Sequence, residues 1–267
     1  MQIFQWLDNA RKKMNSTGIT SSELDSLLLL EYVLSINRAS ILAHPEITLT
    51  QTQITKLAKL LKCRLAREPL AYILGHKEFF GRDFIVNPDA LIPRPESESF
   101  IEILKKQDFE EQTIIDIGCG SGVLGITTKL ELPSNTVILS DVSDKALSVA
   151  KQNIQKHSVD CRTIKANLLP ASIDANIIVA NLPYVPINLK VQPELNFEPA
   201  IALYAKDGGM ELYQKLWSQI STKPSIHFVL TESLVFQHND MAVIAKSAGF
   251  LPDSSEGLVQ LFKRKSS

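Results

Sequence analysis

The chain has 267 residues, of which 45% are apolar and 21% charged, with 13 prolines and 11 glycines. This composition excludes the disordered, collagen-like and disulfide-scaffold classes, and the length allows one large domain or two small ones. Twenty-eight Lys and Arg against 29 Asp and Glu leave a net charge of −1. Because non-specific nucleic-acid binding depends on a basic excess, a general nucleic-acid coat protein is disfavoured.

Cysteine usage and hydropathy favour a soluble protein with reduced thiols. Cys63, Cys119 and Cys161 are odd in number and far apart, so neither a disulfide framework nor a zinc ribbon is predicted. Charged residues from Asp8 to Lys13 precede any apolar run of signal-peptide length, and no run approaches the ~20 apolar residues of a membrane span. We therefore expect a cytoplasmic protein without membrane contact.

Residues 1–67 are predicted to form a small helical domain. Capping-box pairs mark two helix starts, Thr20 with Glu23 and Thr50 with Gln53. Apolar residues at helical spacing follow both pairs; they are Leu24, Leu27, Leu28 and Leu34, then Ile54, Leu57, Ala58, Leu61 and Leu65. Because no catalytic residue types cluster here, we expect a helical bundle with partner recognition as an added role.

Residues 68–92 are predicted to connect this domain to the rest of the chain through a β-hairpin. Glycines punctuate aromatic and β-branched residues between Ile73 and Val86, as in a hairpin. His76 has no second histidine or carboxylate at ligand spacing and is expected at the surface.

Residues 93–267 alternate predicted strands and helices. Short apolar runs cover residues 113–117, 136–140, 161–166, 176–180 and 225–231, with a final strand at 257–263. Amphipathic stretches such as 145–157 lie between most of them. Such alternation predicts right-handed βαβ crossovers and a doubly wound α/β fold, with a mostly parallel sheet covered by helices on both faces.

The first of these strands ends in a glycine loop, Asp116-Ile117-Gly118-Cys119-Gly120-Ser121-Gly122. Glycines let a cofactor approach the backbone and the following helix N-terminus. Residues 120–125 also satisfy the dinucleotide pattern, and Asp141 follows at the interval of a ribose-binding acid, which leaves a dehydrogenase open. However, that match begins a turn too late, and the Asp116 carboxylate would repel a pyrophosphate. A structural turn without a ligand is the remaining alternative.

The loop resembles the S-adenosyl-L-methionine loop of the class I methyltransferases, which have a Rossmann-like doubly wound sheet. The resemblance implies that Asp141 holds the ribose hydroxyls and that Leu168 covers the adenine. Asn167 stands where the family commonly has Asp, and its side-chain oxygen can still accept a bond from the adenine amine. The implied cofactor-binding residues are Asp116, Gly118, Cys119, Gly120, Ser121, Gly122, Asp141, Asn167, Leu168 and Asn181.

A second motif, Asn181-Leu182-Pro183-Tyr184, ends the fourth predicted strand, in the crevice where doubly wound sheets bind ligands. A strand-terminating turn is the simpler interpretation. Alternatively, the Asn181 side-chain oxygen and the next backbone carbonyl can hold both N–H groups of a planar amide or aromatic amine. Its nitrogen would then be aimed at the methyl donor, with the Tyr184 ring against the flat group.

The corner resembles the Asn-(Pro)-Pro-Tyr motif shared by adenine and glutamine-amide methyltransferases. Nearly the whole chain resembles the bacterial protein-(glutamine-N5) methyltransferases that modify the Gly-Gly-Gln loop of class 1 peptide chain release factors. The segment Leu91-Ile92-Pro93-Arg94-Pro95-Glu96-Ser97-Glu98 is the specific one, because adenine methyltransferases do not generally carry it. The resemblance implies a methyltransferase with Asn181, Leu182, Pro183 and Tyr184 as its catalytic residues. The same resemblance implies that the enzyme uses S-adenosyl-L-methionine without a metal and takes a release factor as its substrate. We expect a monomer that makes no direct contact with nucleic acid.

Three positions depart from the family pattern, and two of them, Leu182 and Asn167, keep other functions open. Leu182 stands where the first corner proline is usual, and Ser97 where a threonine is usual. With Asn167, Leu182 is the support for a degenerate cofactor-binding regulatory module without turnover. An adenine-N6 methyltransferase acting on nucleic acid is the rival enzyme, against which the near-zero charge stands.

Overall fold

The computed structural model describes residues 1–265 and divides the chain into two compact units. Residues Met1–Gly75 and Gln192–Phe197 form the first, which we call the helical unit. His76–Val191 and the chain from Glu198 onward form the second, the sheet unit. Within residues 1–265, none of the helices combines the length and the apolar character that crossing a bilayer requires.

The helical unit is a bundle with its own apolar core. Its helices are α1 (Ile3–Ser16), α2 (Ser22–Leu34), α3 (Arg38–Ala43), α4 (Gln51–Leu65) and α5 (Leu70–Leu74). Side chains from α1, α2 and α4, such as Met14, Leu29 and Leu57, are fully buried together. Residues 70–74, predicted as part of a hairpin connector, are therefore helical and belong to this unit.

Only one of the two predicted capping boxes forms. Thr50 caps α4, because its hydroxyl accepts from the Gln53 amide at 3.3 Å and the Gln53 side chain accepts from the Thr50 amide at 2.8 Å. The predicted capping box of Thr20 and Glu23 was wrong, because α2 begins at Ser22 and its N-cap residue is Ser21. Ser21 instead donates to Asp25, at 2.9 Å.

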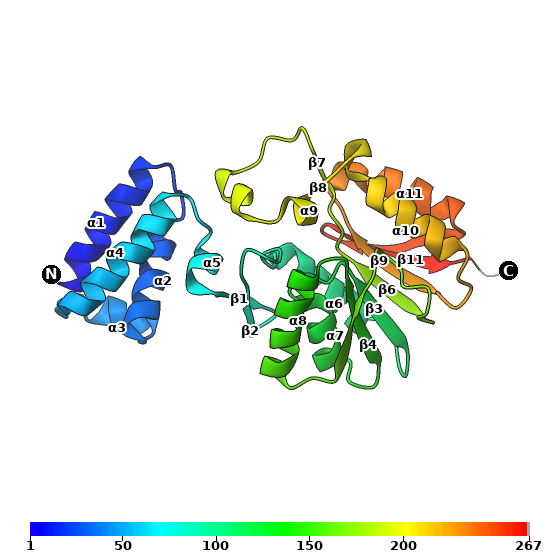
Figure 1. Ribbon diagram of the computed structural model, residues 1–267, viewed down its shortest axis with the longest axis horizontal. Coiled ribbons are helices and arrows are strands. Elements are labelled where there is room, and N and C mark those ends of the chain that lie inside the picture. Colours follow the sequence, from blue (N-terminus) through cyan, green and yellow to red (C-terminus); the bar gives the residue numbers. More distant parts are fainter. Residues whose placement is uncertain (266–267) are drawn as a thin grey trace. The chain divides into compact units, whose positions relative to one another are not determined.

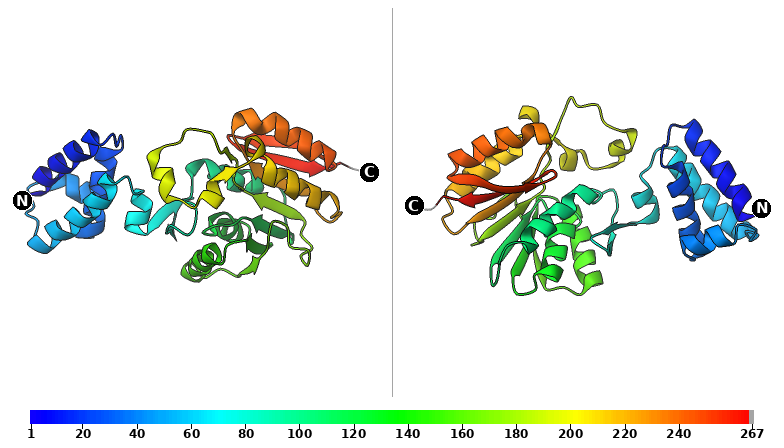
Figure 2. Two further views of the ribbon diagram at one scale, coloured as in Figure 1. Left: turned by 45° about the horizontal axis from the view of Figure 1, so that its top comes forward. Right: turned by 180° about the vertical axis from the view of Figure 1, so that it is seen from behind.

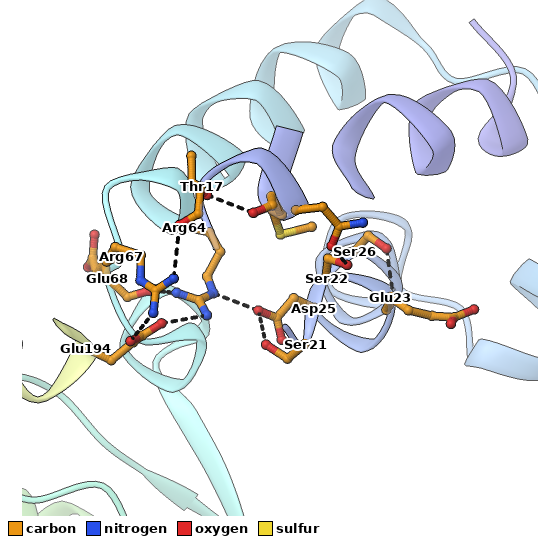
Figure 3. A network of polar contacts seen from close by, with 12 residues as sticks. Thr17, Ser21, Ser22, Glu23, Asp25, Ser26, Arg64, Arg67, Glu68 and Glu194 are labelled. Atoms are coloured by element: carbon orange, nitrogen blue, oxygen red, sulfur yellow. Dashed lines mark hydrogen bonds and ion pairs between the residues drawn. The ribbon is translucent and has the colours of Figure 1, made fainter. Parts of the chain in front are cut away.

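Asp25 is part of a polar network that reaches the segment 192–197 (Figure 3). Arg64, only 5% exposed, donates to Asp25 at 2.7 Å and to Glu194 at 3.1 Å. Arg67 donates to the other Glu194 oxygen at 2.7 Å. Glu194 lies in the short 3₁₀ helix η2 (Pro193–Phe197). The buried Arg64 and the half-buried Arg67 therefore hold this segment, which is distant in sequence, against the bundle.

The sheet unit begins with an antiparallel hairpin of β1 (His76–Phe79) and β2 (Arg82–Ile85). Phe80 and Gly81 form its two-residue turn, and both have positive φ, which matches a type I′ turn. Phe79 and Phe84 are buried in the core of the sheet unit. The hairpin lies inside the range 68–92 predicted for it, and it packs as part of this unit.

Seven strands make the main sheet, in the order β10-β11-β9-β6-β3-β4-β5 (Figure 1). The strands are β3 (Thr113–Ile117), β4 (Thr136–Asp141), β5 (Cys161–Lys165), β6 (Ile177–Ala180), β9 (Phe228–Glu232), β10 (Phe250–Glu256) and β11 (Val259–Arg264). β5, β4, β3, β6 and β9 are parallel, while β11 and β10 are antiparallel additions. The predicted doubly wound fold is confirmed.

Helices cover both faces of this sheet (Figure 2). One face carries α6 (Glu98–Lys105), α7 (Val123–Glu131) and α8 (Asp144–His157), and the other carries α10 (Glu211–Ser221) and α11 (His238–Ser247). Alternation within the strands sorts the side chains: Ile177 and Val179 pack on the α6 face, and Ile178 and Ala180 pack on the α10 face. The same alternation directs Asn181 and Glu232 toward the α6 face.

Further short elements complete the sheet unit: η1 (Pro95–Ser97), β7 (Val185–Pro186), α9 (Ala200–Leu203), β8 (Tyr204–Ala205), η3 (Asp207–Gly209) and η4 (Val235–Gln237). β7 and β8 pair in parallel and so close the base of the long excursion between them.

Candidate active site

A cavity of about 530 Å³ opens beyond the carboxyl ends of β3, β4, β5 and β6. Among the predicted site residues it is lined by Gly118, Gly120, Asp141, Asn167, Leu168, Asn181, Leu182 and Pro183. A smaller cavity of about 50 Å³ is lined by Asp116, Cys119 and Ser121 together with Arg94 and Ser97. Gly118, Gly120 and Asn181 border both, so the glycine loop and the Asn181 corner meet at the junction of the two cavities.

The glycine loop has a backbone conformation that glycine adopts easily and other residues adopt only with strain. Gly118, Gly120 and Gly122 have φ values of +71°, +55° and +83°. A Cβ at Gly120 would have no heavy atom within 4 Å, so this face of the loop is open toward the cavities. The Gly120 amide donates to Asp141 Oδ2 at 2.9 Å, and the Ser143 amide donates to Asp141 Oδ1 at 2.8 Å.

Two of the residues predicted to bind the cofactor, Gly122 and Asp116, instead contact other parts of the protein. Gly122 lines neither cavity, and a Cβ there would lie 2.8 Å from Leu139 Cδ2 and 3.2 Å from the Ala150 Cβ. Asp116 is 1% exposed and accepts a hydrogen bond from the Gly125 amide at 2.9 Å. Burial raises the pKa of Asp116 to about 7. Its side chain therefore fastens α7 to the end of β3.

The larger cavity is also lined by a free polar side chain, that of Asn167, next to the apolar Leu168. Asn167 is exposed, and within residues 1–265 its side chain forms no hydrogen bond. Leu168 is 8% exposed and has a φ of +65°, an uncommon conformation for a branched residue. A half-buried acid, an unpaired amide, an apolar side chain and an open glycine backbone together fit a nucleoside with a charged tail.

The Asn181 corner is supported by hydrogen bonds to Tyr213, a fully buried residue of α10. The Tyr213 hydroxyl lies 3.1 Å from the Ala180 carbonyl oxygen and accepts from the Leu182 amide at 3.2 Å. It also donates to the Glu232 backbone carbonyl at 2.6 Å. A proline at position 182 has no amide hydrogen to give, so the leucine here makes a contact that the usual corner residue cannot make. Its side chain also packs over Gly118, where a Cβ would lie 2.9 Å from Leu182 Cδ2.

Two acceptors at the corner have no protein partner. Within the described chain, no donor reaches the Asn181 Oδ1 atom or the Leu182 carbonyl oxygen. The Asn181 amide nitrogen, by contrast, donates to Ser97 Oγ at 3.0 Å. The two free oxygens are therefore available to accept hydrogen bonds from a ligand beside the cavity.

Sequence reasoning missed Glu232, which is 1% exposed and lies directly behind the corner. Its Oε2 accepts from Ser97 Oγ at 2.6 Å, and its Oε1 accepts from Tyr184 Oη at 2.7 Å. Burial raises the pKa of Glu232, while hydrogen bonds from Ser97, Tyr184 and Asn181 oppose that shift. Burial beside this carboxylate also raises the pKa of Tyr184. A carboxylate directly after the predicted strand 225–231 was the available signal.

Glu198 joins the excursion after the corner to the Arg94 segment. Its side chain accepts from Arg94 Nη2 at 2.5 Å and from the Ile92 amide at 3.0 Å, and the residue is 6% exposed. It is thus a buried bracing residue. Its ties to Ile92 and Arg94 fix the Arg94 segment beside the smaller cavity, which Arg94 also lines.

A doubly wound sheet with an Asp-x-Gly-x-Gly loop and an acid at the end of the adjacent strand defines a class I S-adenosylmethionine-dependent methyltransferase. Two family models match the chain, the PrmC N-terminal domain over residues 5–75 and the methyltransferase small domain over residues 95–198. A release factor glutamine methyltransferase of Coxiella burnetii is 40% identical over 200 residues, which cover 73% of this chain and 72% of that protein. The chain belongs to the release factor glutamine methyltransferase family.

The chain also matches longer relatives in sequence and a solved structure in fold. A bifunctional methyltransferase of Rickettsia bellii is 33% identical over 250 residues, covering 79% of this chain and 44% of that protein. The chain thus spans about half the length of the bifunctional relatives that it matches. The hMettl16 catalytic domain in complex with MAT2A 3′UTR hairpin 1 superposes with a TM-score of 0.56 at 14% identity, covering 87% of this chain and 89% of that one. At this identity the likeness concerns the fold alone.

Proposed function

We propose that this chain transfers a methyl group from S-adenosyl-L-methionine to the side-chain amide nitrogen of the glutamine in the Gly-Gly-Gln loop of class 1 peptide chain release factors. One observation carries the proposal: beside the cavity, neither Asn181 Oδ1 nor the Leu182 carbonyl oxygen has a donor among residues 1–265. A primary amide has two N–H groups, and this pair of acceptors matches them.

The cofactor residues follow from the larger cavity. Asp141 would bind the ribose hydroxyls, Asn167 the adenine amine and Leu168 the adenine face, while the open backbone at Gly120 leaves room for the methionine part. When bound, S-adenosylmethionine supplies an electrophilic methyl group on a sulfonium. Asp116, Cys119 and Ser121 border the smaller cavity, and Gly122 supports the loop by packing.

The chain's own contribution to catalysis is positioning. The nitrogen of an amide is a poor nucleophile because its lone pair is delocalised, so orientation must supply much of the rate. Asn181 and the Leu182 carbonyl would hold both amide protons and aim the nitrogen, and Pro183 and Tyr184 would shape the slot. In the proposed transfer, the amide nitrogen would take the methyl group as the sulfur–carbon bond breaks, and the extra amide proton would then pass to solvent.

Substrate docking is assigned to the helical unit, whose sequence carries no catalytic cluster. The family to which the chain belongs supports a release factor as the partner, since the Coxiella burnetii relative is named for that substrate. The three cysteines are unpaired, which supports a cytoplasmic location. We propose a monomer that makes no direct contact with nucleic acid.

The test uses purified protein, labelled S-adenosylmethionine and three acceptors: a release factor, the same factor with its Gly-Gly-Gln glutamine changed to asparagine, and duplex DNA. We expect label on the first acceptor alone. Asn181→Ala should retain cofactor binding and lose most of the transfer, whereas Asn239→Ala, an exposed change on α11, should match the parent protein. Label on DNA alone would identify an adenine methyltransferase, and cofactor binding without any transfer would identify a regulatory module.

A further inference from the structure

The buried carboxylate of Glu232 has no cationic partner among residues 1–265, yet it lies against the corner that the proposed function requires. β9 runs parallel to β6 with Thr231 opposite Ala180, so Glu232 and Asn181 are the next residues on two neighbouring strands. Both follow the alternation that directs side chains to the α6 face, where Ser97 precedes α6. Three residues from three elements therefore meet at one point.

The direction of each hydrogen bond in this chain of groups is determined by chemistry. As a carboxylate, Glu232 can only accept hydrogen bonds, and in this form the Ser97 hydroxyl proton is directed to its Oε2, at 2.6 Å. Having used its one proton, Ser97 Oγ can only accept from Asn181, and the atom that lies 3.0 Å away is Nδ2. The reversed amide would place Oδ1 against an oxygen that has no proton to give.

We propose that Glu232 is a positioning residue that sets, through the Ser97 hydroxyl, the orientation in which Asn181 presents Oδ1 to the substrate amide. This inference rests on the proposed function. The second carboxylate oxygen orders the other side of the slot in the same way, because it accepts from Tyr184 Oη at 2.7 Å. One buried acid thereby directs two of the four corner residues without touching the substrate.

A buried carboxylate bonded to neutral donors costs stability, and an apolar side chain of similar size would avoid that cost. A functional role explains the arrangement, since two hydroxyls donate to this carboxylate and the Asn181 amide donates to one of those hydroxyls. Without the acceptor, the Ser97 hydroxyl can rotate and donate to Asn181, which allows the amide to flip. The flipped amide offers hydrogens where the substrate also has hydrogens.

The first experiment measures steady-state methyl transfer to a release factor by Ser97→Ala, Ser97→Thr, Glu232→Met and the Ser97→Ala/Glu232→Met double variant. We expect kcat to fall about 10- to 100-fold in both singles, as for a misplaced reacting group, with the cofactor KM within about two-fold of its parent value. The kcat of the double variant should be no lower than that of the less active single variant, because the two residues act in series. Ser97→Thr retains the hydroxyl and should keep most of the activity.

The matched control is Thr231→Val, which removes a buried hydroxyl from the preceding position of β9, on the other face of the sheet. This hydroxyl has no partner within residues 1–265, so kcat should stay unchanged. If Glu232→Met does not fold, the contrast between Ser97→Ala and Ser97→Thr still decides the matter. Parent-like kcat in Ser97→Ala, equal loss in Ser97→Thr, or additive losses in the double variant would overturn the role of Glu232.

A second readout separates this inference from the proposed function. In protein labelled with ¹⁵N-asparagine, the Asn181 side-chain amide signals are assigned by their loss in Asn181→Ala. Hydrogen exchange of this amide should be slow in the parent and in Ser97→Thr, and faster in Ser97→Ala and Glu232→Met. If that pattern holds while no release factor is methylated, the proposed function fails and the positioning role stands. Equal exchange in every variant refutes the positioning role whatever the activity.

Discussion

Glu194 accepts a hydrogen bond from Arg64 at 3.1 Å although 130 residues separate them in the chain. Glu194 lies only 13 positions after Asn181, in a segment that groups with the helical unit rather than with the sheet that precedes it. Four residues further on, Glu198 returns the chain to the sheet unit through Arg94. In the sheet unit, β7 and β8 pair at the base of the segment that follows the corner. Within the helical unit, Arg64 and Arg67 both bind Glu194 (Figure 3).

Replacing Glu194 by glutamine should weaken these contacts. Arg64 and Arg67 would each lose a charged acceptor, while Arg64 keeps Asp25, so we expect a loss of about 2 kcal/mol in the free energy of unfolding. Chemical denaturation measures this, and amide exchange should accelerate across residues 192–197. Glu211→Gln is the control, because its exposed pair with Lys215 should contribute nothing measurable. Equal stability of the two variants would contradict the prediction.

The Asp116 carboxyl predicts a pH dependence of stability. Its pKa rises from an ordinary 3.8 to about 7 on folding, so the folded chain keeps a proton that the unfolded chain loses. Its contribution to stability is thus complete below about pH 4, falls as the pH rises to about 7 and is constant above that. Asp116→Asn keeps an acceptor for the Gly125 amide but cannot titrate. The difference in unfolding free energy between parent and variant should move in favour of the variant from pH 4.5 to 8; a flat difference would refute the raised pKa.

Removing the Tyr213 hydroxyl should weaken the support of the Asn181 corner. Tyr213→Phe leaves the buried Leu182 amide without its acceptor and the Glu232 backbone carbonyl without a donor. We expect a loss of about 1–3 kcal/mol in thermal or chemical unfolding, together with a lower kcat. Tyr204→Phe, a change in a half-buried residue of β8, provides the comparison. A Tyr213→Phe protein as stable as the parent would show that the corner does not depend on this hydroxyl.

Two glycines of the loop should fail in different ways when changed to alanine. Gly122→Ala forces a Cβ to within 2.8 Å of Leu139 at a φ of +83°, so we expect a loss of about 3 kcal/mol or more in stability. Gly120→Ala meets no atom within 4 Å and should cost only the backbone strain of about 1–2 kcal/mol, but its methyl group enters the space that we propose for the cofactor. Thermal unfolding and equilibrium binding of S-adenosylmethionine distinguish the two. Similar profiles for both variants would contradict the assignment.

The sequence by itself determined the class of sheet and most of its strands, because parallel strands buried on both faces appear as short apolar runs. β10 escaped notice, since Leu251 to Ser255 are exposed and largely polar on an edge strand with an irregular register at Pro252. The glycine loop and the corner were visible because their chemistry is local: a φ that only glycine tolerates, and an amide next to a carbonyl.

Tertiary structure alone decided what surrounds those motifs. Ser97 and Glu232 are 135 residues apart, and only the parallel register of β6 and β9 with the placement of α6 brings them to Asn181. Thr20 failed as a cap because α2 begins at Ser22, and the contact of Asp25 in that helix with Arg64, 39 positions away, is one that no local pattern records. Local chemistry is encoded at short spacing along the chain. Which acid stands behind which hydroxyl depends on packing between elements far apart in it.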